Sequence, residues 1–427
     1  MKPALILSTI ILFVTLACGG TTSIVTSTVT PTAASTATPS PGVPVSTASS
    51  QLPTDSSQLW YLTRGDEKSD QLWGVATDSQ GNIYTAGYFQ HPATKTFFDT
   101  IIYKFTPDGN EVWHTQWGGK FQEKAFVVAV AEPYVYIGGL ANNSLSLFDS
   151  DMLVLALDMN DGHVIWKFNW GQGFGYQEVD GLVVDGDHLY VSGWTTGEKT
   201  SGDTAILKLN RADGSLVWAK TWGTDKFDSA DGQMVVDKDA LYISGRINGT
   251  NMLTGGEAVI AKFSKDTGDY LDHRTWGGPI FSDGLGMTSD GTFLYVTGMT
   301  LDKGNGGQIF LLKYDKNLNL VWQQLWGGKN GESARVAEVD ASGNILIAVN
   351  TSSYGAGKSD IALLEFSPDG KLNWSQLWGG PLVDSVHGMA IDGGFVYLVG
   401  STENNSQRLD DALLVKADAQ TGQLPPP

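Results

Sequence analysis

The stretch Trp113-His114-Thr115-Gln116-Trp117-Gly118 decides the fold, because its pattern returns along most of the chain. A Trp-Gly pair recurs at steps of 53, 52, 54, 50 and 52 residues, beginning at Trp117, Trp170, Trp222, Trp276, Trp326 and Trp378. A second tryptophan stands four residues earlier in most units, at Trp113, Trp166, Trp218, Trp322 and Trp374, and Trp60 marks one further unit. A fixed period of about 50 residues is the sequence signature of a repeat fold.

Each repeat contains four short runs that predict strands. Between Trp222 and Trp276 these runs are residues 233–237, 241–245, 258–263 and 270–276, separated by Gly, Asp and Asn. β-Branched and aromatic runs bounded by such residues are typical of strands, and none has a helical period. Four-stranded units repeated radially predict a β-propeller. We therefore expect an all-β, seven-bladed β-propeller with four antiparallel strands in each blade.

The two ends of the repeat region predict how the ring closes. The region starts with a fourth strand around Trp60–Arg64 and stops after a third strand near Asp418. We expect the N-terminal strand to complete the last blade beside Leu413–Lys416, because this pairing removes an open sheet edge.

Two recurring features have a clear structural use. An Asp ends the first strand of most units, as at Asp78, where it can bond the backbone two residues on and set a turn. Asp-Gly pairs such as Asp161-Gly162 suit hairpins with positive φ at the glycine. The two tryptophans of a unit lie four apart on one strand and so share a face, where they can wedge neighbouring sheets together.

These residues resemble known propeller repeats. Asp78–Gly87 followed by Asp99–Lys104 is similar to the bacterial β-propeller repeat often called SBBP. The stretch Ala156–Trp166 also resembles the tryptophan-docking repeat of quinoprotein propellers, which typically have eight blades. Both resemblances imply a propeller, and neither fixes a function.

The front of the chain predicts a lipoprotein leader. Lys2 precedes an apolar stretch from Ala4 to Ala17 that is short for a membrane span, and Leu16-Ala17-Cys18-Gly19 is similar to the lipobox of bacterial lipoproteins. Cys18 is the only cysteine, so no disulfide lies within the chain. An ordinary signal peptide is the alternative. We expect a signal peptide over residues 1–17, lipidation at Cys18, a disordered Ser/Thr/Pro-rich tether over 18–57, the propeller over 58–422 and a tail over 423–427.

Charge and motifs exclude several function classes. The formal net charge of −19 argues against nucleic acid or an anionic lipid surface as a partner of the folded part. The six histidines have no metal-ligand spacing, and no nucleophile elbow, phosphate loop or zinc motif is present. Membrane contact is then expected only through the anchor, which places the protein outside the cytoplasm on a bacterial membrane or cell surface, as a monomer.

One face of the propeller is the candidate binding surface. Loops from a fourth strand to the next blade and from a second to a third strand open on the same side, and loops on a rigid scaffold often carry function. The candidate ligand-binding or cation-binding face consists of Asp70, Glu123, Asp180, Asp228, Asp283, Glu332, Asp384, Trp73 and Trp194. The favoured interpretation is that these acids mainly bond backbone amides of adjacent blades, and a cation or ligand role is the alternative. No cofactor is expected to be required, and Ca²⁺ is a candidate ion.

The sequence favours a non-catalytic binding or scaffold module for protein or carbohydrate. A secreted propeller enzyme is the alternative, either a carbohydrate lyase or hydrolase or a quinone-dependent dehydrogenase. Departures from the repeat, at Arg64, Asp272, Leu346, Val349, Trp194 and Arg246, mark where an asymmetric site would lie.

Overall fold

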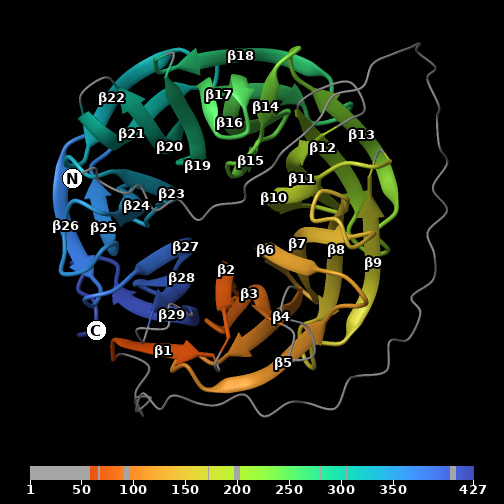
Figure 1. Cartoon of the computed structure of the whole chain (residues 1–427), viewed down its shortest axis with the longest axis horizontal. Helices are drawn as coiled ribbons and strands as arrows, with labels where there is room; N and C mark the ends of the chain where they lie inside the picture. Colours follow the sequence, from red (N-terminus) through yellow and green to blue (C-terminus); the bar gives the residue numbers. More distant parts are fainter. Residues whose placement is uncertain are drawn as a thin grey trace. The chain divides into compact units, whose positions relative to one another are not determined.

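The described part of the chain is a seven-bladed β-propeller (Figure 1). The computed structural model describes residues 58–65, 68–90, 97–171, 173–196, 202–278, 280–302, 305–403 and 410–427, all within one compact unit. Every regular element there is a strand, and the strands form seven antiparallel sheets. The predicted fold class is confirmed. The predicted leader, Cys18 and the tether lie outside the described residues.

Each blade runs from an inner first strand to an outer fourth strand. Blade 1 consists of β2 (Asp70–Thr77), β3 (Ile83–Gln90), β4 (Phe98–Phe105) and β5 (Glu111–Trp117). Blade 2 consists of β6 (Glu123–Ala131), β7 (Tyr134–Asn142), β8 (Ser150–Asp158) and β9 (Val164–Trp170). Blade 3 consists of β10 (Gln177–Asp185), β11 (His188–Thr195), β12 (Asp203–Asn210) and β13 (Leu216–Trp222). Blade 4 has a divided inner strand and consists of β14 (Phe227–Ser229), β15 (Met234–Val236), β16 (Ala240–Asn251), β17 (Thr254–Ser264) and β18 (Tyr270–Trp276).

The remaining blades follow the same order. Blades 5 and 6 consist of β19 (Phe281–Ser289), β20 (Phe293–Asp302), β21 (Asn305–Asp315) and β22 (Leu320–Trp326); and β23 (Glu332–Val339), β24 (Ile345–Thr351), β25 (Asp360–Phe366) and β26 (Leu372–Trp378). Blade 7 combines β27 (Asp384–Asp392), β28 (Phe395–Glu403) and β29 (Asp410–Asp418) with β1 (Trp60–Arg64) from the start of the propeller.

The ring closes where β1 pairs antiparallel with β29. The register runs from Trp60↔Lys416 to Arg64↔Ala412, so the predicted closure beside Leu413–Lys416 is confirmed. The ammonium group of Lys416 also donates to the carbonyl of Pro107 in blade 1 at 3.2 Å. Backbone pairing and a buried side chain thus join the first and last blades, and the outer edge of blade 7 is covered.

The earlier tryptophan of each pair docks on the neighbouring blade. In blade 1, the indole N–H of Trp113 donates to the carbonyl of Met159 at 3.2 Å, and a methyl group at Gly162 would lie 2.6 Å from its ring. Gly162 also has φ of 75°, so this turn needs glycine for its backbone and for the flat contact. The same contact joins Trp166 to Gly214, Trp218 to Gly268, Trp322 to Gly370 and Trp374 to Gly422. The predicted wedge is confirmed.

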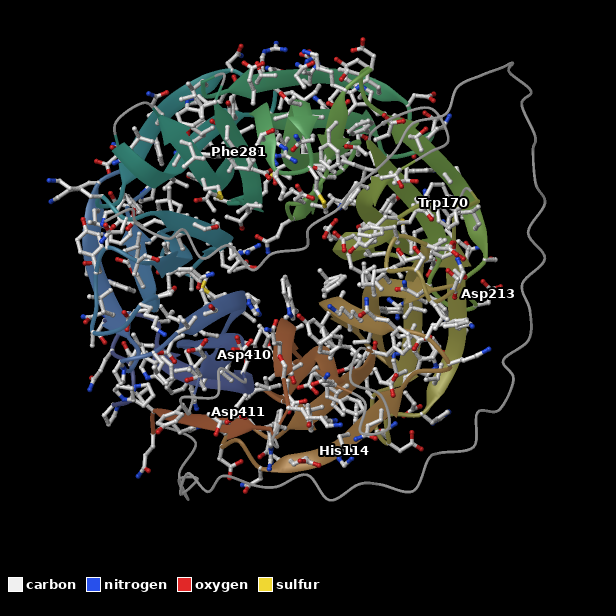
Figure 2. The ribbon with its side chains drawn as sticks, viewed as in Figure 1. His114, Trp170, Asp213, Phe281, Asp410 and Asp411 are labelled. Carbon is white, nitrogen blue, oxygen red and sulfur yellow. The ribbon has the colours of Figure 1, made fainter. Side chains whose placement is uncertain are left out.

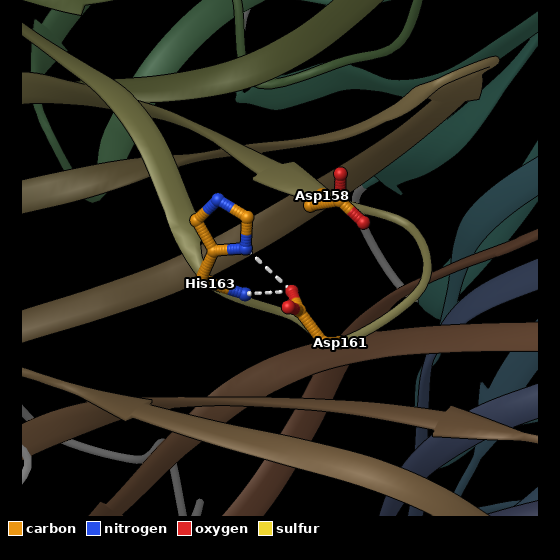
Figure 3. A group of neighbouring side chains, drawn as sticks. All are labelled: Asp158, Asp161 and His163. Atoms are coloured by element: carbon orange, nitrogen blue, oxygen red, sulfur yellow. Dashed lines mark hydrogen bonds and ion pairs between the residues drawn. The ribbon is translucent and has the colours of Figure 1, made fainter.

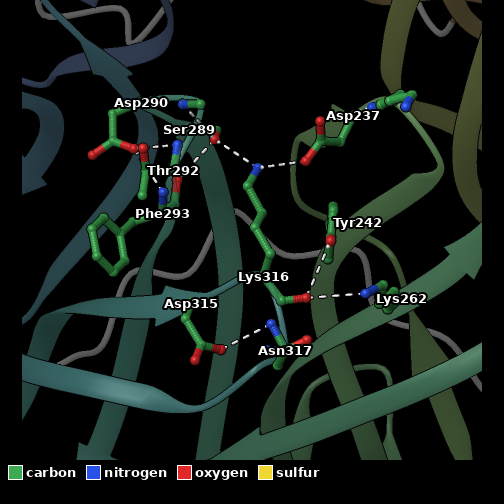
Figure 4. A network of polar contacts seen from close by, with 12 residues as sticks. Asp237, Tyr242, Lys262, Ser289, Asp290, Thr292, Phe293, Asp315, Lys316 and Asn317 are labelled. Carbon is green, nitrogen blue, oxygen red and sulfur yellow. Dashed lines mark hydrogen bonds and ion pairs between the residues drawn. The ribbon is translucent and has the colours of Figure 1, made fainter.

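Polar contacts repeat between blades on the side of the Asp turns (Figure 4). The Lys316 ammonium lies 3.1 Å from the Asp237 carboxylate of blade 4 and donates to Ser289 at 3.0 Å. The Lys316 carbonyl accepts hydrogen bonds from Tyr242 at 3.3 Å and from Lys262 at 3.0 Å. These bonds fix blade 5 against blade 4.

The core is a set of layers between neighbouring blades. One layer contains Tyr84 and Ile102 of blade 1 with Ala125 and Leu155 of blade 2, all with no exposed surface. Leu346 and Val349, two departures from the repeat, are likewise fully buried in such layers. Those two departures are therefore packing changes, and they do not mark a site.

The two faces of the propeller differ in exposed apolar residues. We call the face formed by the fourth-to-first and second-to-third loops the loop face, and the opposite one the turn face. Large exposed apolar side chains on the loop face are Leu145, Leu147, Phe174, Met252, Leu253, Ile280 and Tyr354. All others in the described residues lie on fourth strands, which form the circumference where Figure 2 labels His114. The turn face has none within the described ranges. No helix in this part of the chain is long and apolar enough to cross a membrane.

Candidate functional site

A bulge in the inner strands aims one side chain per blade toward the propeller axis. In six blades the register with the second strand skips one residue, which is Trp73, Phe126, Asp180, Leu285, Arg335 or His387. In blade 4 the pairs Ser229↔Arg246 and Met234↔Ile243 enclose a longer bulge that contains Asp231. Arg335 of blade 6 lies 6.0 Å from the ring of Trp73 in blade 1, two blades away, so these side chains meet across the axis.

Three rings form one wall of this central channel, here called the aromatic wall. Trp73 stacks on His387 with 4.1 Å between ring centroids, and Phe126 meets Trp73 edge-on at 5.3 Å. His387 Nδ1 lies 3.0 Å from the carbonyl oxygen of Leu72. Burial and the nearby Arg335 charge lower the pKa of His387 to about 3. The imidazole is therefore neutral at physiological pH and donates its Nδ1 proton to that carbonyl.

Four carboxylates form the opposite side of the channel, and we call Glu178, Asp180, Asp231 and Asp283 the channel acids. Ligand oxygens of Glu178, Asp180 and Asp231 all lie within 4.8 Å of one another. Burial raises the pKa of Glu178 to about 7, and it raises the pKa of Asp283 to about 8 with help from the Asp231 charge. Burial and the neighbouring carboxylates also raise the pKa of Asp180 well above its usual range. Carboxylates at this spacing repel when all are ionised.

Neighbouring donors fix two of the channel acids. The oxygens of Glu178 accept hydrogen bonds from the Tyr176 hydroxyl at 2.5 Å and from the Trp194 indole N–H at 2.8 Å. The rings of Tyr176 and Trp194 are stacked with centroids 4.9 Å apart. Asp231 accepts from the Ser229 hydroxyl at 2.6 Å. Trp194, which departs from the repeat, thus orients an acid of the channel.

Arg246, Arg335 and Lys124 lie near the channel acids without forming ion pairs with them. Arg246 lies between the rings of Phe227 and Phe281, 4.9 Å from each centroid (Figure 2 labels Phe281). Lys124 lies over Tyr88 at 4.3 Å. Among the described residues, no Lys or Arg nitrogen lies within the 4.0 Å limit of an ion pair with Glu178, Asp180, Asp231 or Asp283.

A second set of acids, the rim acids, bonds the turns that lead into the inner strands. Glu123 accepts from the amide of Gly119 at 3.0 Å, Glu332 from Gly328 at 3.0 Å, and Asp384 from Gly380 at 2.7 Å. Asp228 accepts from the Thr224 amide in the same way. Asp70 begins β2 at the matching place. Glu123, Asp228, Glu332 and Asp384 therefore follow the interpretation in which the acids bond backbone amides.

The candidate face predicted from sequence therefore divides into two sets. Gln177 is the first residue of β10, and Ser282 is the second residue of β19. Both stand at the position where other blades have a rim acid. Asp180 lies three residues past Gln177, and Asp283 one residue past Ser282, so both belong to the channel. Sequence reasoning missed Glu178 and Arg335. A glycine follows the bulge at Gly74, Gly181, Gly232 and Gly388 and is a sequence signal for those channel positions, but valine follows both Glu178 and Arg335.

A third group of possible metal ligands lies on the turn face (Figure 3). Asp158, Asp161 and His163 surround the turn between β8 and β9, and their ligand atoms lie within 4.8 Å. His163 Nδ1 is 2.5 Å from Asp161, and the two side chains are 58% and 66% exposed. Exposed turn acids of this kind need no ion.

The architecture defines a seven-bladed β-propeller whose inner strands bring rings and carboxylates together near the axis. A family model described as "Outer membrane protein assembly factor BamB" matches residues 98–258, from β4 in blade 1 to β17 in blade 4. That range includes Ala156–Trp166, the stretch that resembles tryptophan-docking repeats. The chain is thus similar to this propeller family over part of its length. No curated protein matches the chain.

Solved structures agree on the fold. The polysaccharide lyase Uly1 superposes with a TM-score of 0.52 at 9% identity over 83% of this chain and 91% of that one. The WD40 propeller domain of Doa1 gives 0.50 at 11% identity over 84% and 97%. A quinohemoprotein alcohol dehydrogenase from Comamonas testosteroni gives 0.49 at 13% identity over 84% and 67%. At these identities the first two superpositions show the propeller fold alone.

Proposed function

We propose that the propeller is a non-catalytic binding module that holds a protein partner on its loop face. The observation that carries this proposal is the gathering of exposed apolar side chains on that face. Leu145 and Phe174 are each 72% exposed and project from loops of blades 2 and 3, while the turn face has no such residue among those described. Apolar side chains exposed on the loop face, with none among the described residues of the turn face, favour association with another protein through the loop face.

The front of the chain and the family match support the same proposal. A lipidated Cys18 and a tether over residues 18–57 would hold the propeller at a bacterial membrane or cell surface, outside the cytoplasm. The match over residues 98–258 to a family described as an assembly factor also favours a protein partner over a glycan. We propose that the propeller acts as a monomer and that its SBBP-type repeats supply a rigid support for the loops.

Site-specific photo-crosslinking tests the proposal in cells that produce the full chain. A photoreactive residue placed at Leu145, Phe174 or Leu253 should give an adduct of one defined mass. The same residue at Val217 or Leu271 is the matched control, because these side chains are 46% and 52% exposed on fourth strands. Equal adducts from both sets, or none from the loop face, would contradict the proposal.

A carbohydrate-active enzyme is the second candidate, and the channel acids favour it. A pKa of about 7 at Glu178 with carboxylates at close range suits general acid–base chemistry. Incubation with uronate-containing and neutral polysaccharides, followed by ultraviolet absorbance and reducing-end assays, tests this candidate. Turnover that Glu178→Gln abolishes would establish it in place of the binding module.

A quinone-dependent dehydrogenase fits the channel poorly. One face of Trp73, the ring best placed to stack on a quinone, is already covered by His387 at 4.1 Å. Without a bound cation, an anionic quinone would also meet the carboxylates of Glu178, Asp180 and Asp231, which would repel it.

A further inference from the structure

We propose that the channel acids bind one divalent cation, for which Ca²⁺ is best suited, at the loop-face end of the central channel. The ligands would be Glu178 and Asp180 of blade 3, Asp231 of blade 4 and Asp283 of blade 5. The ion would thus join three consecutive blades at a place where their inner strands bring carboxylates together.

The spacing of the carboxylates fits a shared ion. Oxygens of Glu178, Asp180 and Asp231 lie within 4.8 Å of one another. Two oxygens bound to the same Ca²⁺ are at most about 5 Å apart, because each Ca²⁺–O bond is about 2.3–2.6 Å long. The three oxygens can therefore be ligands of one ion without a change of backbone.

A buried and unpartnered carboxylate oxygen independently indicates a ligand. Asp283 is only 6% exposed, and its Oδ1 has no hydrogen-bond partner. The charge of Asp231 raises the pKa of Asp283, and the charge of Asp283 raises the pKa of Asp180, so Asp283 lies near two members of the group of three. Asp180 Oδ2 is buried and unpartnered as well. Buried carboxylates ordinarily have hydrogen bonds, ion pairs or a metal, and these oxygens lack the first two among the described residues.

The surrounding side chains support the ligands in the way that metal sites commonly do. Tyr176 and Trp194 each donate to one oxygen of Glu178, and Ser229 donates to Asp231. Each of these oxygens keeps a lone pair for a cation. Donors of this kind fix the orientation of ligating carboxylates and increase metal affinity.

The set of ligands selects the type of ion. All of the atoms are carboxylate oxygens, which suit hard cations, and no His or Cys belongs to the group, which argues against Zn²⁺. Mg²⁺ demands a near-ideal octahedron and retains several waters. Ligands from three separate blades suit the larger and more adaptable coordination of Ca²⁺ better.

Calorimetric titration of the chelator-treated full chain with CaCl₂ tests the site. We expect one ion per chain and a rise of several degrees in melting temperature. Asp180→Asn and Glu178→Gln should each weaken binding at least tenfold, and the melting curve of each variant shows that it is folded. Asp161→Asn, in the exposed group of the turn face, is the matched control and should bind Ca²⁺ like the wild type. No heat up to millimolar Ca²⁺, or binding lost only in Asp161→Asn, would overturn the proposal.

Terbium luminescence locates the ion without relying on a destabilised variant. Tb³⁺ replaces Ca²⁺ at oxygen sites and is sensitised by a nearby indole, and Trp194 bonds directly to the ligand Glu178. We expect sensitised emission from the wild type that Ca²⁺ displaces and that falls at least twofold in Trp194→Phe. Emission unaffected by both Trp194→Phe and Asp180→Asn would place the ion elsewhere and refute the assignment. The site can exist whether or not a protein binds the loop face, so crosslinking and titration fail independently.

Discussion

The rim acids and the channel acids both come from inner strands, mostly of different blades, and their surroundings differ. Glu332 is 3% exposed and each of its oxygens accepts a hydrogen bond, from the Gly328 amide at 3.0 Å and from the Thr351 hydroxyl at 3.2 Å. Asp283 is as deeply buried, but its Oδ1 has no partner. A shift of a single position along the strand therefore separates an acid that stabilises a turn from an acid that opposes its neighbours.

This difference shows where the propeller gives up stability. Buried carboxylates that accept hydrogen bonds stabilise the folded protein. Carboxylates that lie close together without donors destabilise it, and a bound ligand can offset this cost. Conflict between local interactions and the fold is expected at functional sites. The rim belongs to the scaffold by this criterion, and the channel belongs to the site.

Removing a rim acid should give the largest effect. Glu332→Ala leaves the Gly328 amide and the Thr351 hydroxyl without their acceptor in a buried place, so we expect a loss of about 2–4 kcal/mol in the free energy of unfolding. Denaturant unfolding measures it. Ser333→Ala, one residue on, is the control and should change stability by less than about 0.5 kcal/mol. A loss below about 1 kcal/mol for Glu332→Ala would contradict the claim that the rim acids, unlike the channel acids, stabilise the fold.

The aromatic wall should make stability depend on pH. The pKa of His387 is about 3 in the folded chain against an ordinary 6.5, so the unfolded chain binds more protons between these values. The stability that neutral His387 contributes is fully present above about pH 6.5 and is lost as pH falls toward 3. Compared with His387→Asn, the wild type should lose up to about 3 kcal/mol between pH 7 and pH 4.

Thermal unfolding of both proteins across this range measures the difference. The groups around His387 are Trp73, the Leu72 carbonyl and Arg335, and Arg335 stays charged throughout. His163→Asn, in an exposed turn, is the control and should show the same pH profile as the wild type. Parallel profiles for the wild type and His387→Asn would mean that water reaches the imidazole freely.

Neutralising a channel acid should stabilise the metal-free protein. Asp180→Asn keeps the size of the side chain and removes one of the close charges, so we expect a gain of about 0.5–1.5 kcal/mol at pH 8 in chelator. The same change at the rim, Asp384→Asn, weakens the acceptor for the Gly380 amide and should lower stability. A gain in stability for Asp180→Asn together with a loss for Asp384→Asn would support the distinction between channel acids and rim acids. Equal losses would show that the channel acids also serve the scaffold.

Much of the fold could be predicted because its determinants repeat. The tryptophans, the Asp turns and the Asp-Gly pairs each recur at a fixed place, and the contacts of Trp113 with Gly162 show why they do. The closure by β1 followed from counting strands. Repetition is what made these predictions strong, since each unit tests the others.

The site could be predicted only in part because it depends on departures from the repeat. Asp180 and Asp283 were chosen for their approximate place before or within the inner strand, and they were grouped with Glu123 and Asp384, which bond turns. A bulge of one residue re-aims a side chain, and its position could not be fixed to a single residue without the register. Glu178 was missed because its importance comes from Asp231 in the next blade, a contact that no local pattern encodes.

The smallest effect should come from the acidic group on the turn face. Asp158, Asp161 and His163 match Glu178, Asp180 and Asp231 in the number and spacing of their possible ligand atoms, but Asp161 and His163 are more than half exposed. Hydrogen bonds from His163 already lower the pKa of Asp161, so its charge is stabilised where it stands. The melting temperature of Asp161→Asn should equal that of the wild type, both in the absence and in the presence of Ca²⁺. A Ca²⁺-dependent shift that disappears in this variant would mean that solvated turn acids bind the ion, and burial would then cease to distinguish the two groups.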